Sequence, residues 1–180
     1  SSTARWAGLK TATSLNNMDT CAQVLADGIT LDPHKFKMFF TREFAPGGYA
    51  WVFPKGPDSA NIGLGISGEY SREKSPVQLL EAFLEFHYPE ASIIERTVGG
   101  ISCTGGIKKL VADGLMVAGD AAHLANPITG AGIVNAMISG KLAAETAHEA
   151  LKKGETTVSA LKSYSKMCET RIIKMNRIFY

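Results

Sequence analysis

The first half of the chain carries short runs of alternating apolar and polar residues, a pattern typical of strands with one buried face. Turn-forming clusters such as APGG and PKGPDS separate the runs. The pattern predicts extended segments at residues 22–27, 36–41, 49–53, 61–66 and 92–103.

One helix is predicted within this half, at SPVQLLEAFLEFHYP. Ser75 suits the N-cap position, and Gln78 completes a capping box with it. Pro76 fits the first turn, and Pro89 stops the helix. Four of the extended segments precede this helix and one follows it.

The second half has a different periodicity. An apolar run at residues 115–118 predicts a buried strand. Beyond the glycines that follow, apolar residues recur at helical spacing until about Gly154, and a last helix is predicted from about Thr157. The predicted fold class is therefore α+β: a mostly antiparallel sheet, then a strand, a special turn and two helices.

Composition indicates a folded protein, because 45% of the 180 residues are hydrophobic and 20% are charged. The net charge of +2, with no long Lys/Arg run, argues against a nucleic-acid partner. Asp120, Pro127 and several glycines interrupt the longest weakly charged stretch, which argues against a membrane span. The cysteines have neither disulfide nor zinc spacing, so no metal site is predicted and a reducing, cytoplasmic location is expected; they are Cys21, Cys103 and Cys168.

Residues 63–68 spell GLGISG, which satisfies the G-x-G-x-x-G pattern of dinucleotide-binding loops. In such a loop the glycines open a helix directly, so that its free N–H groups meet the pyrophosphate. Here a polar loop, EYSREK, comes next, and no acidic residue ends a second strand at the required distance. We therefore do not expect a Rossmann fingerprint at this position.

The stretch LMVAGDAAHLANPITGAG places Asp120 just beyond the predicted strand at residues 115–118. An ionised carboxylate only accepts hydrogen bonds, so it suits ligand hydroxyl groups. Gly130, Ala131 and Gly132 would leave backbone N–H groups exposed at the helix start, where the helix dipole favours an anion. The alternative is that Asp120 caps a turn and the glycines only allow close packing.

The stretch YAWVFPKGPDSANIGLG carries the second candidate site. On a strand, Tyr49, Trp51 and Phe53 point to one face, and Gly63 and Gly65 share a face of the returning strand. Aromatic side chains next to positions without side chains could form a slot for a long apolar ligand. They could equally be aromatics that cover strand glycines in a core.

The sequence GDAAHLANPITGAGIVNA resembles the second FAD-binding motif of flavoproteins of the 4-hydroxybenzoate hydroxylase type. The resemblance implies that Asp120 contacts the FAD ribityl chain and that Pro127 lies beside the isoalloxazine ring. It further implies that backbone N–H groups near Gly132 and Ile133 face the pyrimidine edge of that ring. The cofactor-binding residues are then Gly119, Asp120, Pro127, Gly130, Gly132 and Ile133.

The pattern YxWxFP, eight residues and then GxG resembles the substrate-side signature of the geranylgeranyl reductase family. RWAGL at residues 5–9 and KLVADGLMVAGDAA at residues 109–122 are similar to archaeal members that saturate membrane-lipid chains. The resemblance runs from residue 1 to about residue 153. The substrate-binding residues that it implies are Tyr49, Trp51, Phe53, Pro54, Gly63 and Gly65.

This resemblance implies a flavin-dependent oxidoreductase that hydrogenates C=C bonds of geranylgeranyl chains in membrane lipids, with FAD as cofactor. Its partners would be a prenyl-lipid substrate, an electron donor such as reduced nicotinamide or ferredoxin, and a membrane surface in peripheral contact. A flavin-dependent aromatic hydroxylase would share the FAD motif. A non-catalytic prenyl-lipid-binding module would keep only the slot.

The resemblance also implies a domain arrangement, in a fragment of an FAD-linked reductase fold. Residues 1–19 would be the tail of the middle FAD motif, 20–110 an antiparallel substrate-binding domain, 111–154 the strand-turn-helix of the FAD-binding domain, and 155–180 a C-terminal helix. The glycine fingerprint of the family's nucleotide-binding unit does not occur in these residues. We therefore expect a piece of a longer protein, which alone would be inactive.

Two further features are open to more than one interpretation. His123 could transfer a proton near the flavin, or it could be a hydrogen-bonded structural residue. The last thirty residues contain seven Lys/Arg and two Glu, a net charge of +5. This basic helix could contact a membrane surface, or its lysines could simply be solvated.

Overall fold

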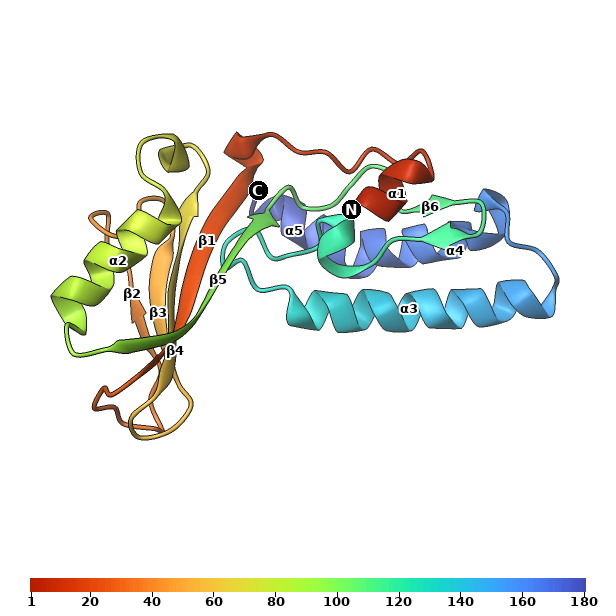
Figure 1. Ribbon diagram of the computed structural model, residues 1–180. Helices are drawn as coiled ribbons and strands as arrows, with labels where there is room; N and C mark the ends of the chain where they lie inside the picture. The colour runs from red at the N-terminus through yellow and green to blue at the C-terminus, as the bar shows by residue number, and fades with distance from the viewer. The chain divides into compact units, whose positions relative to one another are not determined.

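The computed structural model describes all 180 residues and divides them into two compact units (Figure 1). Leu15–Gly100 forms the first, here called the sheet unit, and Ser1–Ser14 with Ile101–Tyr180 forms the second, the helical unit. Each unit has a buried apolar cluster of its own. Each is therefore a separately packed body.

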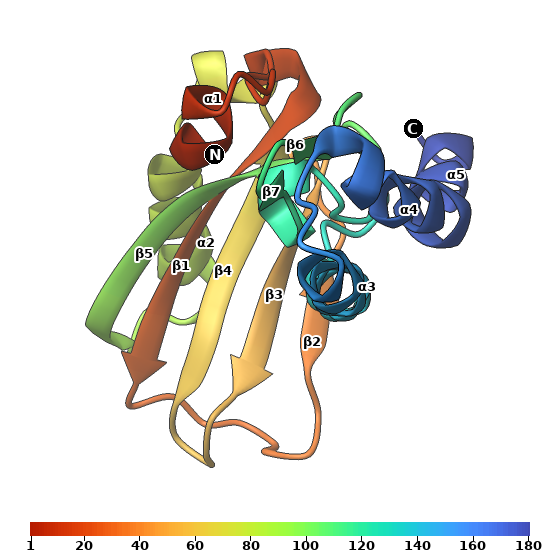
Figure 2. The same cartoon turned by 90° about the vertical axis from the view of Figure 1, so that its right-hand side faces the viewer.

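The sheet unit is built on five strands in the order β2-β3-β4-β1-β5, as Figure 2 shows. The pairs β1 with β4, β3 with β4 and β2 with β3 are antiparallel, which confirms the predicted α+β class with its antiparallel sheet. The elements are η1 (Leu15–Asn17), β1 (Met18–Asp27), β2 (Lys37–Phe39), β3 (Tyr49–Pro54), β4 (Ala60–Ser67), η2 (Tyr70–Arg72), α2 (Pro76–His87) and β5 (Ser92–Ser102).

Two predicted strand boundaries are wrong. β1 begins at Met18, four residues before the apolar run that signalled it, because its early residues pair with the far end of β4 up to Ser67. β2 contains only Lys37–Phe39, since its pairing with β3 extends over just three residues. Strand length here follows the partner strand, which hydropathy does not report.

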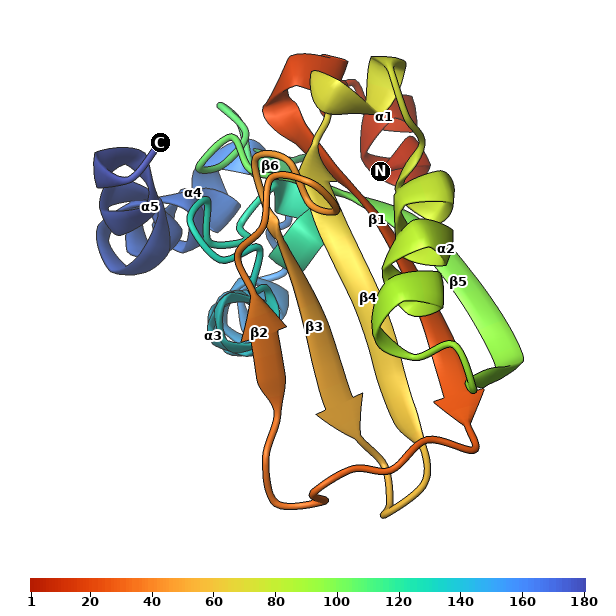
Figure 3. The same cartoon turned by 90° about the vertical axis from the view of Figure 1, so that its left-hand side faces the viewer.

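Helix α2 covers one face of the sheet and packs on β1 and β4 (Figure 3). Ser75 caps it, and the reciprocal bonds between Ser75 and Gln78 form the predicted capping box. Phe83, fully buried, lies in the middle of its apolar side. The sheet residues that face α2 are small or branched and almost fully buried: Ala22, Val24, Ala26, Ala50, Val52, Ile62, Leu64 and Ile66.

GLGISG lies within and just beyond β4, with Gly63 and Gly65 in the paired strand, so these glycines do not open a helix. The structure thus confirms that this pattern is not a dinucleotide-binding loop.

The helical unit surrounds a long helix, α3, that packs against α4. Its elements are α1 (Ser2–Trp6), β6 (Val111–Ala112), β7 (Leu115–Met116), η3 (Gly119–Ala122), α3 (Ile133–Lys152), α4 (Val158–Cys168), the π-helical turn η4 (Glu169–Ile173) and α5 (Lys174–Ile178). None of these helices, nor α2, combines the length and the apolar character that crossing a bilayer requires.

The buried strand predicted at residues 115–118 is shorter than expected. Only Leu115 and Met116 pair, in a small antiparallel hairpin with β6. The Val117 N–H still donates to the Leu110 carbonyl, at 2.9 Å, but the Val117 carbonyl accepts a hydrogen bond from the Tyr164 hydroxyl, at 2.6 Å. A helix therefore supplies the partner that a neighbouring strand would have supplied.

The last helix is interrupted at η4, where the chain makes a π-helical turn. The extra residue of such a turn shifts the apolar side around the axis. Before the turn, Leu161 and Cys168 are buried as a regular helical period predicts, whereas beyond it Ile173 and Asn176 are buried and Met175 is exposed. Met175, which a regular helical period would place on the same side as Leu161 and Cys168, is therefore exposed.

Candidate functional sites

The first candidate site, in the helical unit, is built around Asp120. This residue lies in η3, directly after Gly119, whose positive φ of 56° favours glycine. The Gly119 N–H donates to the Ser139 hydroxyl of α3 at 3.0 Å, and this bond ties the turn to the helix. The Asp120 side chain is exposed and makes neither a hydrogen bond nor an ion pair within the protein. An acceptor-only group is therefore free at the surface of the helical unit.

The carboxylate of Asp120 lies over the backbone of Gly132, at the N-cap of α3. A Cβ atom built on Gly132 would stand 2.6 Å from Oδ1 of Asp120. The absence of a side chain at residue 132 is thus a steric requirement for this carboxylate position. The η3 turn and the start of α3 therefore form one continuous surface.

The loop before α3 is closed by its own hydrogen bonds. The Asn126 carboxamide oxygen accepts from the backbone N–H groups of Ile128 and Thr129, at 2.9 and 3.1 Å. The Gly130 N–H donates to the Asn126 carbonyl, and the Ala131 N–H donates to the Thr129 hydroxyl. The expectation that the amides of Gly130 and Ala131 would be exposed for a ligand is therefore wrong, because this turn uses both internally.

The free amides begin one residue later. The backbone N–H groups of Gly132, Ile133 and Val134 have no acceptor within the protein, as is usual at a helix start. Ile133 is 79% exposed, and Met137, one turn further along α3, is 71% exposed. Free amides with exposed apolar side chains next to them suit a flat ligand with a polar edge.

His123 is buried near this turn, and both of its ring nitrogens are engaged. Nε2 lies 3.1 Å from the Thr11 carbonyl, and Nδ1 lies 3.1 Å from the Thr104 hydroxyl. A carbonyl only accepts, so Nε2 carries the proton. Burial lowers the pKa of His123, although the bond to Thr11 opposes the shift. This geometry favours the structural interpretation of His123 over a role in proton transfer.

The second candidate site lies in the sheet unit, on the face of the sheet away from α2. Tyr49, Trp51 and Phe53 alternate with the buried Ala50 and Val52, so they are on this outer face. The rings form a continuous row, with centroid distances of 5.8 Å between Tyr49 and Trp51 and 6.1 Å between Trp51 and Phe53. These rings therefore lie outside the buried core of the sheet unit, although Trp51 does cover a strand glycine, Gly63.

Strand β2 extends this row to the edge of the sheet. Met38 is the register partner of Trp51. Phe36 lies against Phe53 and Phe40 against Tyr49, with ring centroids 6.2 and 5.9 Å apart. The six side chains are called the aromatic strip: Phe36, Met38, Phe40, Tyr49, Trp51 and Phe53. Phe40 is 79% exposed and Phe36 is 69% exposed, an unusual amount of apolar surface on one face.

The two glycines of the signature lie opposite the strip on β4, but they do not leave an empty slot. A Cβ atom on Gly63 would stand 2.5 Å from a ring carbon of Trp51, so the indole lies flat on the glycine backbone. A Cβ atom on Gly65 would stand 3.2 Å from Sγ of Cys21. Burial, together with the charge of Asp19, raises the pKa of Cys21 to about 11, so this thiol is neutral at physiological pH. Gly63 therefore allows the Trp51 ring to pack closely on this face of the sheet.

Sequence reasoning missed several residues that hold these sites in place. Asn126 closes the turn before α3, and its Asn-Pro pair was an available turn signal. Ser139 is fully buried inside a helix and had no distinguishing local pattern. Gln23 accepts a hydrogen bond from the Trp51 indole N–H at 3.0 Å across two strands, a contact that only the sheet register reveals.

The fold places the chain in a broad structural class. A flavin-dependent brominase and a flavin-dependent halogenase superpose on 91% and 93% of the chain, with TM-scores of 0.67 and 0.64. Their sequences are only 18% and 16% identical to this one, so these likenesses concern the fold alone. The chain thus has the fold of these flavin-dependent enzymes.

More similar proteins narrow this class to one family. Residues 17–101 match the family described as geranylgeranyl reductase catalytic domain. Digeranylgeranylglycerophospholipid reductase of Methanothrix thermoacetophila is 45% identical over 162 residues, and digeranylgeranylglycerophospholipid reductase 2 of Methanococcoides burtonii is 41% identical over 170. A geranylgeranyl bacteriochlorophyll reductase-like protein of Thermoplasma acidophilum superposes with a TM-score of 0.88 at 33% identity. The chain belongs to the geranylgeranyl reductase family.

The alignments cover most of this chain but less than half of each relative. The alignments include 90% and 94% of this chain but only 41% and 42% of the two reductases. The structural match includes 96% of this chain and 44% of the Thermoplasma protein. The chain therefore spans about two fifths of the length of its relatives.

Proposed function

We propose that this chain is the part of an FAD-dependent reductase that holds the flavin edge and the prenyl chain of a geranylgeranyl lipid while C=C bonds are hydrogenated. The relatives named above carry such activity in their names, and they align with nearly all of the chain. The observation that carries the proposal is the unpartnered Asp120 carboxylate above the bare backbone of Gly132, beside three free helix amides.

The residues of the helical unit fit FAD. Asp120 can accept hydrogen bonds from hydroxyl groups of a ribityl chain. The amides of Gly132, Ile133 and Val134 can donate to the polar edge of a flat ring, and their dipoles favour negative charge there. FAD, when bound, supplies a hydride to one carbon of the double bond.

The residues of the sheet unit fit the substrate. The aromatic strip is apolar, rigid and long enough to place several side chains against an extended prenyl chain, whose burial from water supplies the binding free energy. Pro54 ends the strand that carries three of these rings. A proton must also reach the second carbon of the double bond. An electron donor, reduced nicotinamide or ferredoxin, must then reduce the flavin again.

The first test is the visible spectrum of the natural full-length protein. We expect flavin absorbance in the purified protein and its loss in Asp120→Ala. Asp58→Ala is the control, because Asp58 is exposed and its carboxylate has no partner within the protein. A colourless protein that cannot be reconstituted with FAD, or equal flavin content in both variants, would contradict the cofactor assignment.

The second test separates substrate from cofactor binding. Trp51→Ala should reduce turnover of geranylgeranyl lipids far more than flavin content. Trp6→Ala is the control, since Trp6 is 84% exposed and lies in the other unit. Equal loss of turnover and flavin in Trp51→Ala would mean that the indole only supports the fold. Rapid oxygen consumption with an aromatic substrate would indicate a hydroxylase instead.

A further inference from the structure

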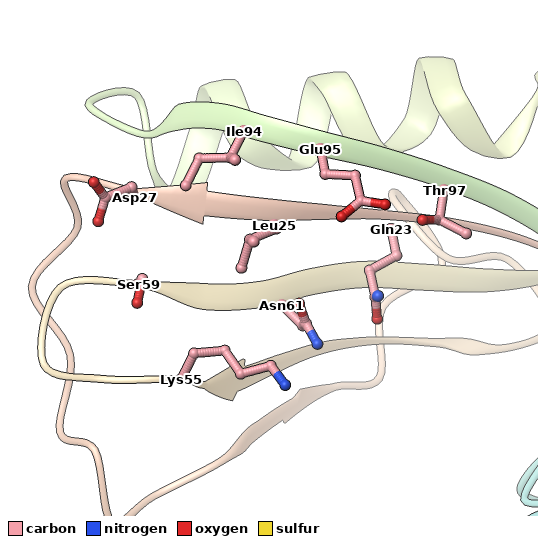
Figure 4. Close-up of a pocket in the computed structure, with 9 residues that line it drawn as sticks. All are labelled: Gln23, Leu25, Asp27, Lys55, Ser59, Asn61, Ile94, Glu95 and Thr97. Atoms are coloured by element: carbon pink, nitrogen blue, oxygen red, sulfur yellow. The ribbon is translucent and has the colours of Figure 1, made fainter.

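Trp51, Gly63 and Gln23 form one row across three strands of the sheet unit. Trp51 on β3 is the register partner of Gly63 on β4, and Gly63 is in turn the partner of Gln23 on β1. Because Gly63 has no side chain, the indole extends over β4, and its N–H donates to the Gln23 carboxamide oxygen at 3.0 Å. The Gln23 side chain extends over β4 from β1 (Figure 4). This hydrogen bond therefore joins β3 to β1 above the strand that separates them.

The indole ring covers the backbone of two glycines. A Cβ atom built on Gly63 would stand 2.5 Å from Cζ2 and 2.7 Å from Cε2 of Trp51, and one built on Gly65 would stand 4.0 Å from Cζ3. One face of the ring is therefore turned to the sheet. The opposite face is turned outward in the aromatic strip, between the rings of Tyr49 and Phe53, where an apolar ligand would contact it.

The glycine contacts alone do not fix the rotation of this ring. The torsion that turns an aromatic ring about its Cβ–Cγ bond has broad energy wells. The neighbouring part of the same face is also open, because a hollow of about 640 Å³ lies there, with Gln23, Leu25 and Asn61 among its lining residues. The indole thus has space to turn, and the hydrogen bond to Gln23 selects one orientation.

The neighbours of Gln23 cannot take over this role. On β1, the side chains that share its face are those of Cys21 and Leu25, two residues away on either side. Leu25 has no hydrogen-bond acceptor, and the neutral thiol of Cys21 is a weak one. Asn61 on β4 lies on the same face, but its carboxamide makes no hydrogen bond within the protein. Gln23 is therefore the acceptor that orients the indole.

We propose that Gln23 is a positioning residue of the prenyl site, which acts by holding the Trp51 ring flat across β4. In this orientation the outward face of the indole continues the apolar surface between Tyr49 and Phe53. The inference rests on the proposed function, and it adds a polar residue, outside the aromatic strip, on which the shape of the strip depends. Gln23 acts through Trp51 and not through the lipid.

Steady-state kinetics test this with the natural full-length, flavin-loaded protein and a digeranylgeranylglycerophospholipid as substrate. Gln23→Leu keeps a side chain of similar size but removes the acceptor. It should raise KM about 3- to 10-fold, the scale of one lost hydrogen bond, and leave kcat and flavin content unchanged. A purely structural role would instead lower kcat and flavin content together, because less protein would be folded. An unchanged KM would overturn the inference.

Three further variants show whether the effect passes through Trp51. Gln23→Glu keeps an acceptor oxygen and should restore the parental KM. Asn61→Leu is the matched control, because it removes a carboxamide from the same face that has no partner within the protein, and its KM should stay parental. In a Trp51→Phe background no indole N–H remains, so Gln23→Leu should raise KM no further. An equal rise in KM with and without the indole would refute positioning through Trp51.

NMR of the indole N–H tests the positioning independently of turnover. The Trp51 signal is the indole resonance that disappears in Trp51→Phe. Gln23→Leu should speed its exchange with solvent about 3- to 10-fold, whereas Gln23→Glu and Asn61→Leu should not. Equal exchange rates in the parent protein and Gln23→Leu would overturn the inference. No turnover in the parent protein, with the expected change in exchange, would contradict the reductase proposal alone. Normal turnover with a parental KM in Gln23→Leu would contradict the role of Gln23 alone.

Discussion

Asp120 and Gly132, twelve residues apart, form one surface: the carboxylate of the first occupies the space that a Cβ atom of the second would need, with only 2.6 Å between that atom and Oδ1. The neighbouring atom is the end of a short side chain and not backbone, so Asp120 can move away when the space is filled. A methyl group at residue 132 would therefore change the site more than the fold.

We expect Gly132→Ala to weaken FAD binding about tenfold or more, the scale of a lost hydrogen bond to a charged group. The free energy of unfolding should change by about 1 kcal/mol or less. Flavin fluorescence titration and urea unfolding give the two quantities. Gly140→Ala is the control: a Cβ atom there meets nothing within 4 Å, and alanine in a helix interior should stabilise by about 0.5–1 kcal/mol. Unchanged FAD affinity in Gly132→Ala would contradict the site.

Gly63 and Trp51 make a second close pair, with different consequences. A Cβ atom on Gly63 would stand 2.5 Å from the indole and 2.8 Å from the Ala22 carbonyl oxygen, and the backbone atom cannot move away cheaply. Gly63→Ala should therefore destabilise the sheet unit by about 1–3 kcal/mol. It should also displace Trp51, which changes the fluorescence of the folded protein.

Gly99→Ala is the matched control for Gly63→Ala. Gly99 also lies in a strand, β5, but a Cβ atom there meets nothing within 4 Å. We expect its urea midpoint to stay close to that of the parent chain. If Gly63→Ala were as well tolerated as Gly99→Ala, the packing of Trp51 on the glycine would not matter for stability.

The fold class could be predicted from the sequence because its signals are local. Strand alternation at Tyr49–Pro54 and the Ser75–Gln78 capping box depend only on residues within one element. The details that were wrong depend on distant partners. The β7 ladder ends where Tyr164, 47 residues away, supplies a hydroxyl, and the amides of Gly130 and Ala131 are closed by a turn whose geometry is set by Asn126.

The same contrast holds for the sites. Residue types alone left open whether Asp120 and the aromatic residues of β3 were available for ligands. In the structure Asp120 is exposed, and Tyr49 and Trp51 are half-buried. The row of Phe36, Met38 and Phe40 beside them depends on the register of β2 against β3. The position of β5 beside β1 is likewise set by strand pairing, and no periodicity of a single segment encodes this neighbour.

Tyr164 and Val117 link α4 to the segment that leads to Asp120. Tyr164 is fully buried, and burial raises the pKa of its hydroxyl far above the usual value, so it stays a donor at all accessible pH. Tyr164→Phe leaves the Val117 carbonyl without its partner and should destabilise the helical unit by about 1–3 kcal/mol. Tyr70→Phe in the sheet unit, where the hydroxyl has no partner within the protein, should have no effect. Hydrogen exchange resolves the two units, and equal protection in both variants would contradict this prediction.

His123 should make the stability of the helical unit depend on pH. Burial lowers its pKa below the ordinary value of 6.5, so at a pH between the two values the unfolded chain binds a proton that the folded chain does not. The free energy of unfolding therefore falls as the pH drops below about 6.5 and levels off below the folded pKa. Above pH 6.5 the contribution of His123 to the free energy of unfolding has its full value.

The variant His123→Asn tests this pH dependence without disturbing the backbone. His123 has a φ of 57°, in the left-handed region that asparagine tolerates better than other residues with side chains. We expect the parent chain to lose stability between pH 7.5 and pH 5.5, and His123→Asn to lose less over the same range. Urea midpoints at several pH values measure the loss, and NMR titration of the imidazole gives the folded pKa. An imidazole that titrates at or above 6.5 would show that burial does not control its charge.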